Sequence, residues 1–157
     1  MIRASREAVV DEAMSWIGTR YHHAARVKAV RDAGGRIIDR GGVDCATLLA
    51  EIYGGLGLVQ NLAVPSYPHD WHMHRRSERY LQVVREHATE IDRADAAPGD
   101  VVMFHFGHTF SHAGVLVRPG YPHMVHPFHM ARAVTLDRAD AGPCATVAQR
   151  FFTLWAC

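Results

Sequence analysis

The stretch Gly41-Gly42-Val43-Asp44-Cys45-Ala46-Thr47-Leu48-Leu49-Ala50-Glu51-Ile52-Tyr53 joins a glycine turn to a predicted amphipathic helix. Apolar side chains recur along it at the spacing of one helix face, at positions 45, 48, 49, 52, 53 and 56. Asp44 is the predicted N-cap, and the glycines at 54, 55 and 57 mark the expected end. Because an apolar helix face needs a partner layer, the pattern predicts a helix packed on a sheet.

Cys45 is the first residue of this predicted helix. The unsatisfied N–H groups and the positive end of the helix dipole favour a thiolate over a thiol, so we expect a pKa below the usual value of about 8.5. Cys45 is therefore a candidate nucleophile. A lone cysteine on an apolar helix face is more often a small buried hydrophobe, so the hypothesis needs a histidine base elsewhere in the chain.

Composition narrows the function classes. The 157 residues, 48% hydrophobic and 21% charged, predict one globular domain spanning residues 1–157. The net charge of +1 and the lack of a basic run interleaved with aromatics argue against a nucleic-acid partner. The three cysteines, at 45, 144 and 157, have no CxxC spacing, which favours a reducing compartment. Without an apolar signal core or membrane span, the chain is expected to be soluble and cytoplasmic as synthesised.

Helical patterns come first in the chain and strand patterns follow. Ser5 is the predicted cap of a helix that ends near Gly18, and a second amphipathic helix is predicted over 77–87. The polar, glycine-bearing residues 31–40 predict a loop or short hairpin. Predicted strands are Val101–Phe106, Ala113–Val117, Met124–Phe128, Ala133–Leu136 and Arg150–Trp155. This order indicates an α+β fold, with helices on one face of an antiparallel meander.

Two of the twelve histidines lie on predicted neighbouring strands. Strand alternation gives His112 the same face as Gly114, and the next strand carries His126. If Arg118–Gly120 forms a three-residue hairpin loop, paired residue numbers sum to 238 and His112 faces His126. Their Cβ atoms would then be about 4.5–5.5 Å apart, so His126 can orient His112. This is the base that Cys45 requires.

Cys45, His112 and His126 together resemble the NlpC/P60 family of papain-like cysteine peptidases. The matching segments are Trp16–Tyr21, Gly42–Cys45, Pro98–Val102, Ser111–Val115 and Met124–His126. Tyr67–His72 and Glu78–Leu81 are similar to the subgroup of phage and prophage cell-wall peptidases and tail-associated hydrolases.

The resemblance implies a papain-like fold and hydrolysis of a peptide bond next to D-glutamate or diaminopimelate in peptidoglycan, without a cofactor. The expected partners are a peptidoglycan stem peptide and, for the subgroup, phage tail proteins. Cys45 would attack the carbonyl, His112 would take the thiol proton and return it to the leaving amine, and His126 would fix the tautomer of His112.

Three further residues are assigned to oxyanion stabilisation and substrate binding. Tyr21 resembles the family tyrosine that reaches into the site, and Asp44 lies beside the nucleophile. Trp71 is expected to line a pocket, although anchoring a loop on the core is an equally good interpretation. The backbone N–H of Cys45 is the expected oxyanion donor.

Two features depart from the family pattern. Ala46 replaces a serine that helps many members to recognise a free stem-peptide amine. The connection between Tyr21 and Cys45, residues 22–44, is longer than usual, and we expect it to form a flap over the cleft.

Two other functions remain open. One is a metal site, because His69, His72 and His74 lie close together in sequence, as do His105, His108 and His112. The other is a phage-tail structural component that keeps the fold without turnover.

Overall fold

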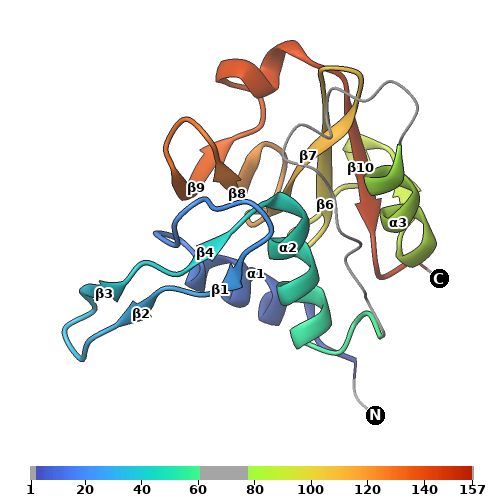
Figure 1. The fold of residues 1–157 in the computed structure, drawn as a ribbon. Helices are drawn as coiled ribbons and strands as arrows, with labels where there is room; N and C mark the ends of the chain where they lie inside the picture. The colour runs from blue at the N-terminus through green and yellow to red at the C-terminus, as the bar shows by residue number, and fades with distance from the viewer. Residues whose placement is uncertain (1–2, 61–77, 157) are drawn as a thin grey trace.

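The computed structural model describes residues 3–60 and 78–156 and has the expected α+β architecture (Figure 1). Helices α1 (Arg6–Ser15) and α2 (Cys45–Leu49) pack on one face of a six-stranded antiparallel sheet, and α2 continues as a π-helical turn, η1 (Ala50–Gly54). Helix α3 (Arg79–His87) precedes the sheet strands. Within the described ranges, no helix is long and apolar enough to cross a bilayer.

The strands of the large sheet are β5 (Thr89–Ile91), β6 (Val101–Phe106), β7 (Thr109–Leu116), β8 (His123–Phe128), β9 (Ala133–Arg138) and β10 (Gln149–Thr153). Their order is β5-β10-β6-β7-β8-β9. The predicted meander is therefore correct for β6 to β9, whereas β10 returns to the far edge of β6 and pairs there. Two short 3-10 turns connect strands of this sheet: η3 (Arg93–Asp95) lies between β5 and β6, and η4 (Gly142–Thr146) lies between β9 and β10.

The predicted register between β7 and β8 is wrong by two residues. Val115 pairs with Val125, so paired numbers sum to 240, and the Val117 N–H donates to the His123 carbonyl at 3.1 Å. Pro122 has no N–H to donate to a ladder, and the loop accordingly extends to residues 118–122. A shift of two preserves the face of every side chain, so His112 and His126 become diagonal rather than direct neighbours.

The sheet separates two apolar layers. The face under the helices carries Met103, Ala113 and Val125 in one cluster with Cys45 and Leu48 of α2. The opposite face carries a second cluster: Val102, Phe104, Leu116, Met124, Ala139, Cys144 and Phe151. The second cluster includes a residue of η4, which connects β9 to β10.

The long connection before the nucleophile forms two small sheets. β1 (Arg26–Val27) pairs with β4 (Gly42–Val43), and β2 (Val30–Arg31) pairs with β3 (Ile37–Asp39), which confirms a short hairpin. The expected flap over the cleft stays a prediction. The β2–β3 hairpin projects away from the main sheet (Figure 1), and Arg31 anchors it by donating to the Ile17 carbonyl at 2.7 Å.

Candidate active site

Asp44 caps helix α2 as predicted and fixes the position of the following cysteine. Its carboxylate accepts hydrogen bonds from the backbone N–H groups of Ala46 and Thr47, both at 3.0 Å, and the Thr47 hydroxyl accepts from the Asp44 N–H at 2.9 Å. The other carboxylate oxygen accepts from the Ala24 N–H at 2.7 Å. Asp44 therefore joins the inserted segment to the helix start, and these contacts give it a structural role.

Cys45 is buried, with 6% of its surface exposed, and its thiol donates to the Ser111 carbonyl at 3.4 Å. Burial, followed by the charge of Asp44, raises the pKa of the thiol well above its usual range. The N–H groups of Ala113, Ala46 and Cys45 lower that pKa, but by less. The expected helix-end effect is thus present, although desolvation outweighs it and the resting group is a thiol.

The two candidate histidines are hydrogen-bonded to each other and to an aspartate. His112 Nε2 lies 2.8 Å from His126 Nδ1, and His126 Nε2 lies 2.9 Å from Asp137 Oδ2. The Thr135 hydroxyl donates to the same carboxylate oxygen at 2.7 Å. Sequence reasoning missed Asp137 because the predicted strand ended at Leu136, one residue short.

This chain of hydrogen bonds fixes the protons of both rings. Hydrogen bonds from Thr135 and His126 lower the pKa of Asp137, against the raising effect of burial, so the carboxylate is ionised and can only accept. His126 must then donate from Nε2 and accept at Nδ1, and His112 must donate from Nε2. His112 Nδ1 is left with a lone pair, which is the form that a general base requires.

Both imidazoles rest in the neutral form. Burial, together with the charge of His126, lowers the pKa of His112 to about 3. Burial also lowers the pKa of His126, although the Asp137 hydrogen bond and charge oppose the shift. Cys45 and His112 are therefore a neutral thiol and a neutral imidazole at physiological pH.

Cys45 approaches His112 from the helix side of the sheet. Its sulfur contacts the backbone on both sides of His112, at the Ser111 carbonyl and the Ala113 N–H. In the ladder between β7 and β8, Val115 pairs with Val125 and Leu116 with Met124. The ladder does not extend to His112. Among the described residues, the hydrogen bond of the thiol goes to this carbonyl and not to a ring nitrogen.

Tyr21 lies in the electrostatic environment of the nucleophile. Burial, followed by electrostatic interactions with Cys45 and Asp44, raises the pKa of its phenol. Its backbone bonds the Arg132 carbonyl at 2.9 Å, and its ring meets His129 edge-on with centroids 5.6 Å apart. Trp71, the other predicted substrate contact, lies outside the described residues.

One of the two predicted histidine clusters falls on residues that the structure describes. His69, His72 and His74 lie outside the described residues. Of the second predicted group, His105 packs edge-on against Phe110, with centroids 5.1 Å apart. Across residues 3–60 and 78–156, the cluster of metal-type donors is instead His112 with His126 and Cys144.

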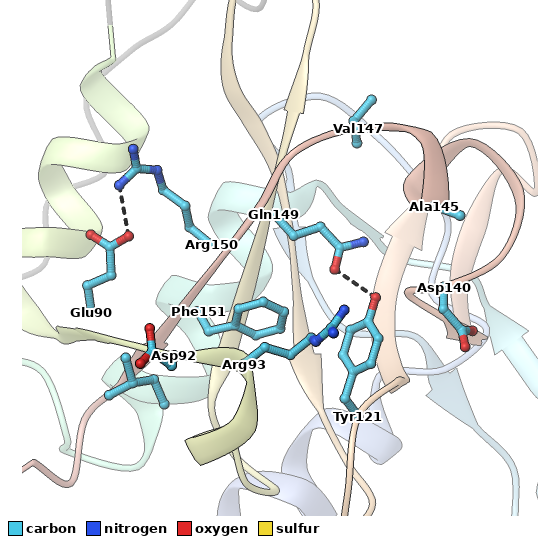
Figure 2. A pocket seen from close by; sticks show the side chains of 11 residues that line it. Glu90, Asp92, Arg93, Tyr121, Asp140, Ala145, Val147, Gln149, Arg150 and Phe151 are labelled. Carbon is cyan, nitrogen blue, oxygen red and sulfur yellow. Dashed lines mark hydrogen bonds and ion pairs between the residues drawn. The ribbon is translucent and has the colours of Figure 1, made fainter.

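A hollow of about 640 Å³ is lined by other residues, among them Asp140 and Ala145 on either side of Cys144 in the sequence (Figure 2). Tyr121 and Gln149 line it, and the Tyr121 hydroxyl donates a hydrogen bond of 2.7 Å to the Gln149 side chain. Arg150 and Glu90, which also line it, form an ion pair at 2.8 Å. None of the described candidate catalytic residues lines it.

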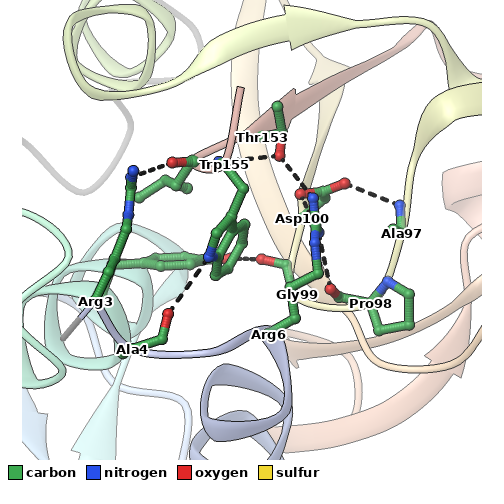
Figure 3. A network of polar contacts seen from close by, with 11 residues as sticks. Arg3, Ala4, Arg6, Ala97, Pro98, Gly99, Asp100, Thr153 and Trp155 are labelled. Carbon is green, nitrogen blue, oxygen red and sulfur yellow. Dashed lines mark hydrogen bonds and ion pairs between the residues drawn. The ribbon is translucent and has the colours of Figure 1, made fainter. Parts of the chain in front are cut away.

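The Pro98–Asp100 segment has a structural role (Figure 3). Arg6 of α1 donates to Asp100 at 2.7 Å and to the Thr153 hydroxyl at 3.1 Å, while its guanidinium stacks 4.4 Å from the Trp155 ring centroid. Asp100 is fully buried. This network ties the first helix to β6 and to the end of β10.

A model of the NlpC/P60 family matches residues 18–148, which include Tyr21, Cys45, His112, His126 and Asp137. The chain belongs to the NlpC/P60 family. Comparison with curated protein sequences gives no match.

Solved NlpC/P60 structures share the fold at low sequence identity. NlpC2 from Trichomonas vaginalis has a TM-score of 0.59 at 20% identity, covering 94% of this chain and 47% of that chain. The peptidoglycan hydrolase RipB from Mycobacterium tuberculosis also scores 0.59, at 18% identity, covering 95% of this chain and 64% of that one. RipD from M. tuberculosis, described as a non-catalytic NlpC/P60 protein adapted to peptidoglycan binding, scores 0.59 at 16% identity, with coverages of 95% and 96%. The chain thus spans about half of the first of these proteins.

Proposed function

We propose that this NlpC/P60 domain is a cysteine peptidase that hydrolyses peptide bonds in the stem peptides of peptidoglycan. The observation that carries the proposal is the hydrogen-bonded chain from Asp137 through His126 to His112, which gives the base its reactive tautomer, while Cys45 Sγ contacts the carbonyl of the preceding residue, Ser111. A chain of three buried or partly buried polar groups is costly to desolvate. Such groups cluster at functional sites, which supports a catalytic role for this chain.

The proposed reaction starts from a neutral pair. As Cys45 Sγ attacks the carbonyl carbon, its proton passes to His112 Nδ1, so thiolate and imidazolium form during the attack. The oxyanion faces the Cys45 N–H, with Tyr21 beside it. His112 then protonates the leaving amine, and a water molecule hydrolyses the thioester with His112 again as base.

His126 and Asp137 act as positioning residues in this scheme. When His112 gains a proton, its Nε2–H donates more strongly to His126, and the positive charge is stabilised through His126 by the Asp137 carboxylate. The carboxylate need not take the proton itself.

The proposed bond is of the γ-D-glutamyl-diaminopimelate type. Because Ala46 offers no hydroxyl to a free stem-peptide amine, we propose that the site tolerates substrates with a blocked N-terminus. The segments Tyr67–His72 and Glu78–Leu81 support a phage or prophage peptidase, virion-associated and in contact with tail proteins.

The test is digestion of purified muropeptides of defined sequence, with products identified by mass. We expect one new amine and one new carboxylate at a single peptide bond, and no product from Cys45→Ala. If wild-type protein and Cys45→Ala bind peptidoglycan equally and neither releases product, the domain is a binding module like the one described for RipD.

A further inference from the structure

We propose that His112, His126 and Cys144 bind a divalent metal ion of the zinc type, and that the bound ion inhibits the peptidase. One ring nitrogen of each histidine and Cys144 Sγ lie within 4.8 Å of one another. Ligand atoms of a tetrahedral zinc site are about 3.3–3.6 Å apart, given bonds of about 2.0–2.3 Å, so the two imidazole nitrogens, now hydrogen-bonded at 2.8 Å, must move apart slightly to admit the ion beside Cys144. Two imidazoles and a thiolate are a donor set that zinc favours, with a fourth position left for water.

The surroundings of His126 suit a metal ligand. Its Nδ1 faces His112 Nε2 at 2.8 Å, and its Nε2 bonds Asp137 at 2.9 Å. Metal-binding histidines usually donate their other ring N–H to a carboxylate, which orients the ring and makes it a stronger ligand. Asp137, held by Thr135 at 2.7 Å, already occupies that position.

Cys144 faces inward from a segment that is otherwise exposed. It is the buried residue of η4, with 3% of its surface accessible, while Gly142, Pro143, Ala145 and Thr146 are exposed. The Gln149 amide donates to the carbonyls of Ala139 and Cys144, at 2.8 and 3.1 Å, and so fixes the turn. The proposed peptidase mechanism makes no use of this thiol.

Proton balance explains how binding would inhibit. The Cys144 thiol loses its proton to solvent as the thiolate–metal bond forms. For His112 Nε2 to coordinate, its proton must move to Nδ1, and the ring stays neutral. His112 Nδ1 then carries a proton and cannot accept the one from Cys45. The inhibition rests on the proposed peptidase function, whereas the metal binding does not.

Binding is tested first, without reference to activity. The full chain is freed of metal with EDTA and titrated with Co²⁺, whose absorption reports tetrahedral geometry and thiolate coordination. We expect one ion per chain and a thiolate-to-cobalt charge-transfer band. This band should remain in Cys45→Ala and vanish in Cys144→Ser and Cys144→Ala. His105→Ala, which changes a histidine outside the cluster, is the matched control and should bind as wild type does.

Zinc affinity is then measured in competition with a chromophoric chelator. Inhibition by zinc is measured separately, as loss of the hydrolysis rate. Asp137→Asn should bind zinc about 10- to 100-fold more weakly, as expected for loss of a carboxylate that orients a histidine ligand. Zinc should inhibit wild type, and Cys144→Ser far less, each relative to its own rate in EDTA. A cobalt band that vanishes in Cys45→Ala, or no binding at micromolar metal, would overturn the proposal. A Cys144-dependent band in a protein without turnover would uphold the metal site while refuting the peptidase.

Discussion

Asp137→Asn tests whether the hydrogen-bonded chain supports catalysis. Asp137 Oδ2 accepts from both Thr135 and His126, so an asparagine oxygen can keep both contacts while the charge is lost. Hydrogen bonds to charged groups contribute about 1–1.5 kcal/mol more than neutral ones, which corresponds to about tenfold in rate. Because the Asp137 side chain is 44% exposed, solvent screens its charge, and we expect kcat to fall about three- to tenfold.

The assay is steady-state hydrolysis of a muropeptide from pH 4 to 9. The loss should fall on kcat with little change in KM, because the positive charge that Asp137 stabilises develops only during reaction. Asp137 raises the pKa of His126, so its loss should move the acid limb to lower pH. Asp140→Asn, an exposed carboxylate paired with Arg138, is the control. If Asp137→Asn leaves kcat and the pH profile unchanged, or changes KM alone, then Asp137 has no role in catalysis through His126.

Three further outcomes are expected. His112→Ala should lower the rate by about 10²–10⁴ or more, close to Cys45→Ala, whereas His126→Gln should retain clearly more activity; a silent His126→Ala would remove it from the site. The free energy of unfolding should fall as pH drops from 6.5 toward 3, by up to about 1.4 kcal/mol per pH unit. The reason is that His112 takes up a proton at a pKa near 6.5 in the unfolded chain but only near 3 in the folded one. Urea unfolding at pH 7 and 4.5 measures this loss, and an equal loss in His112→Gln would contradict the explanation. Gly114→Ala places a Cβ 2.9 Å from Met124 Sδ and 3.2 Å from His126 Cβ, and should lower the free energy of unfolding by about 1–3 kcal/mol. The control is Gly54→Ala, whose added Cβ meets nothing within 4 Å. Equal shifts of the melting temperature in the two variants would count against close packing at Gly114.

The parts of the fold that depend on local sequence could be predicted. Capping by Ser5 and Asp44 is decided within a few residues of each helix start, and both caps formed as expected. The face of each strand follows from the period of two, so His112 and His126 share a face even though their register was wrong. An even slip in register leaves alternation intact.

The parts of the fold and of the site that depend on contacts between distant segments could not be predicted from the sequence. Asp137 joins the site because β9 pairs with β8, and Cys144 reaches it because η4 packs inward on the second face of the sheet. Neither residue has a local pattern that marks it. The pKa of Cys45 was predicted in the wrong direction because the helix end is visible in the sequence, whereas the depth of burial is set by tertiary packing.

The central claim is that Cys45, and not the cysteine beside the two imidazoles, attacks the substrate. The most direct measurement is to mix protein and muropeptide, quench with acid during turnover, and locate the acyl-enzyme by intact mass and peptide mapping. We predict a mass increase equal to the acyl half of the substrate, attached to Cys45 and absent in Cys45→Ser. An adduct on Cys144, or turnover that persists in Cys45→Ala, would contradict the account.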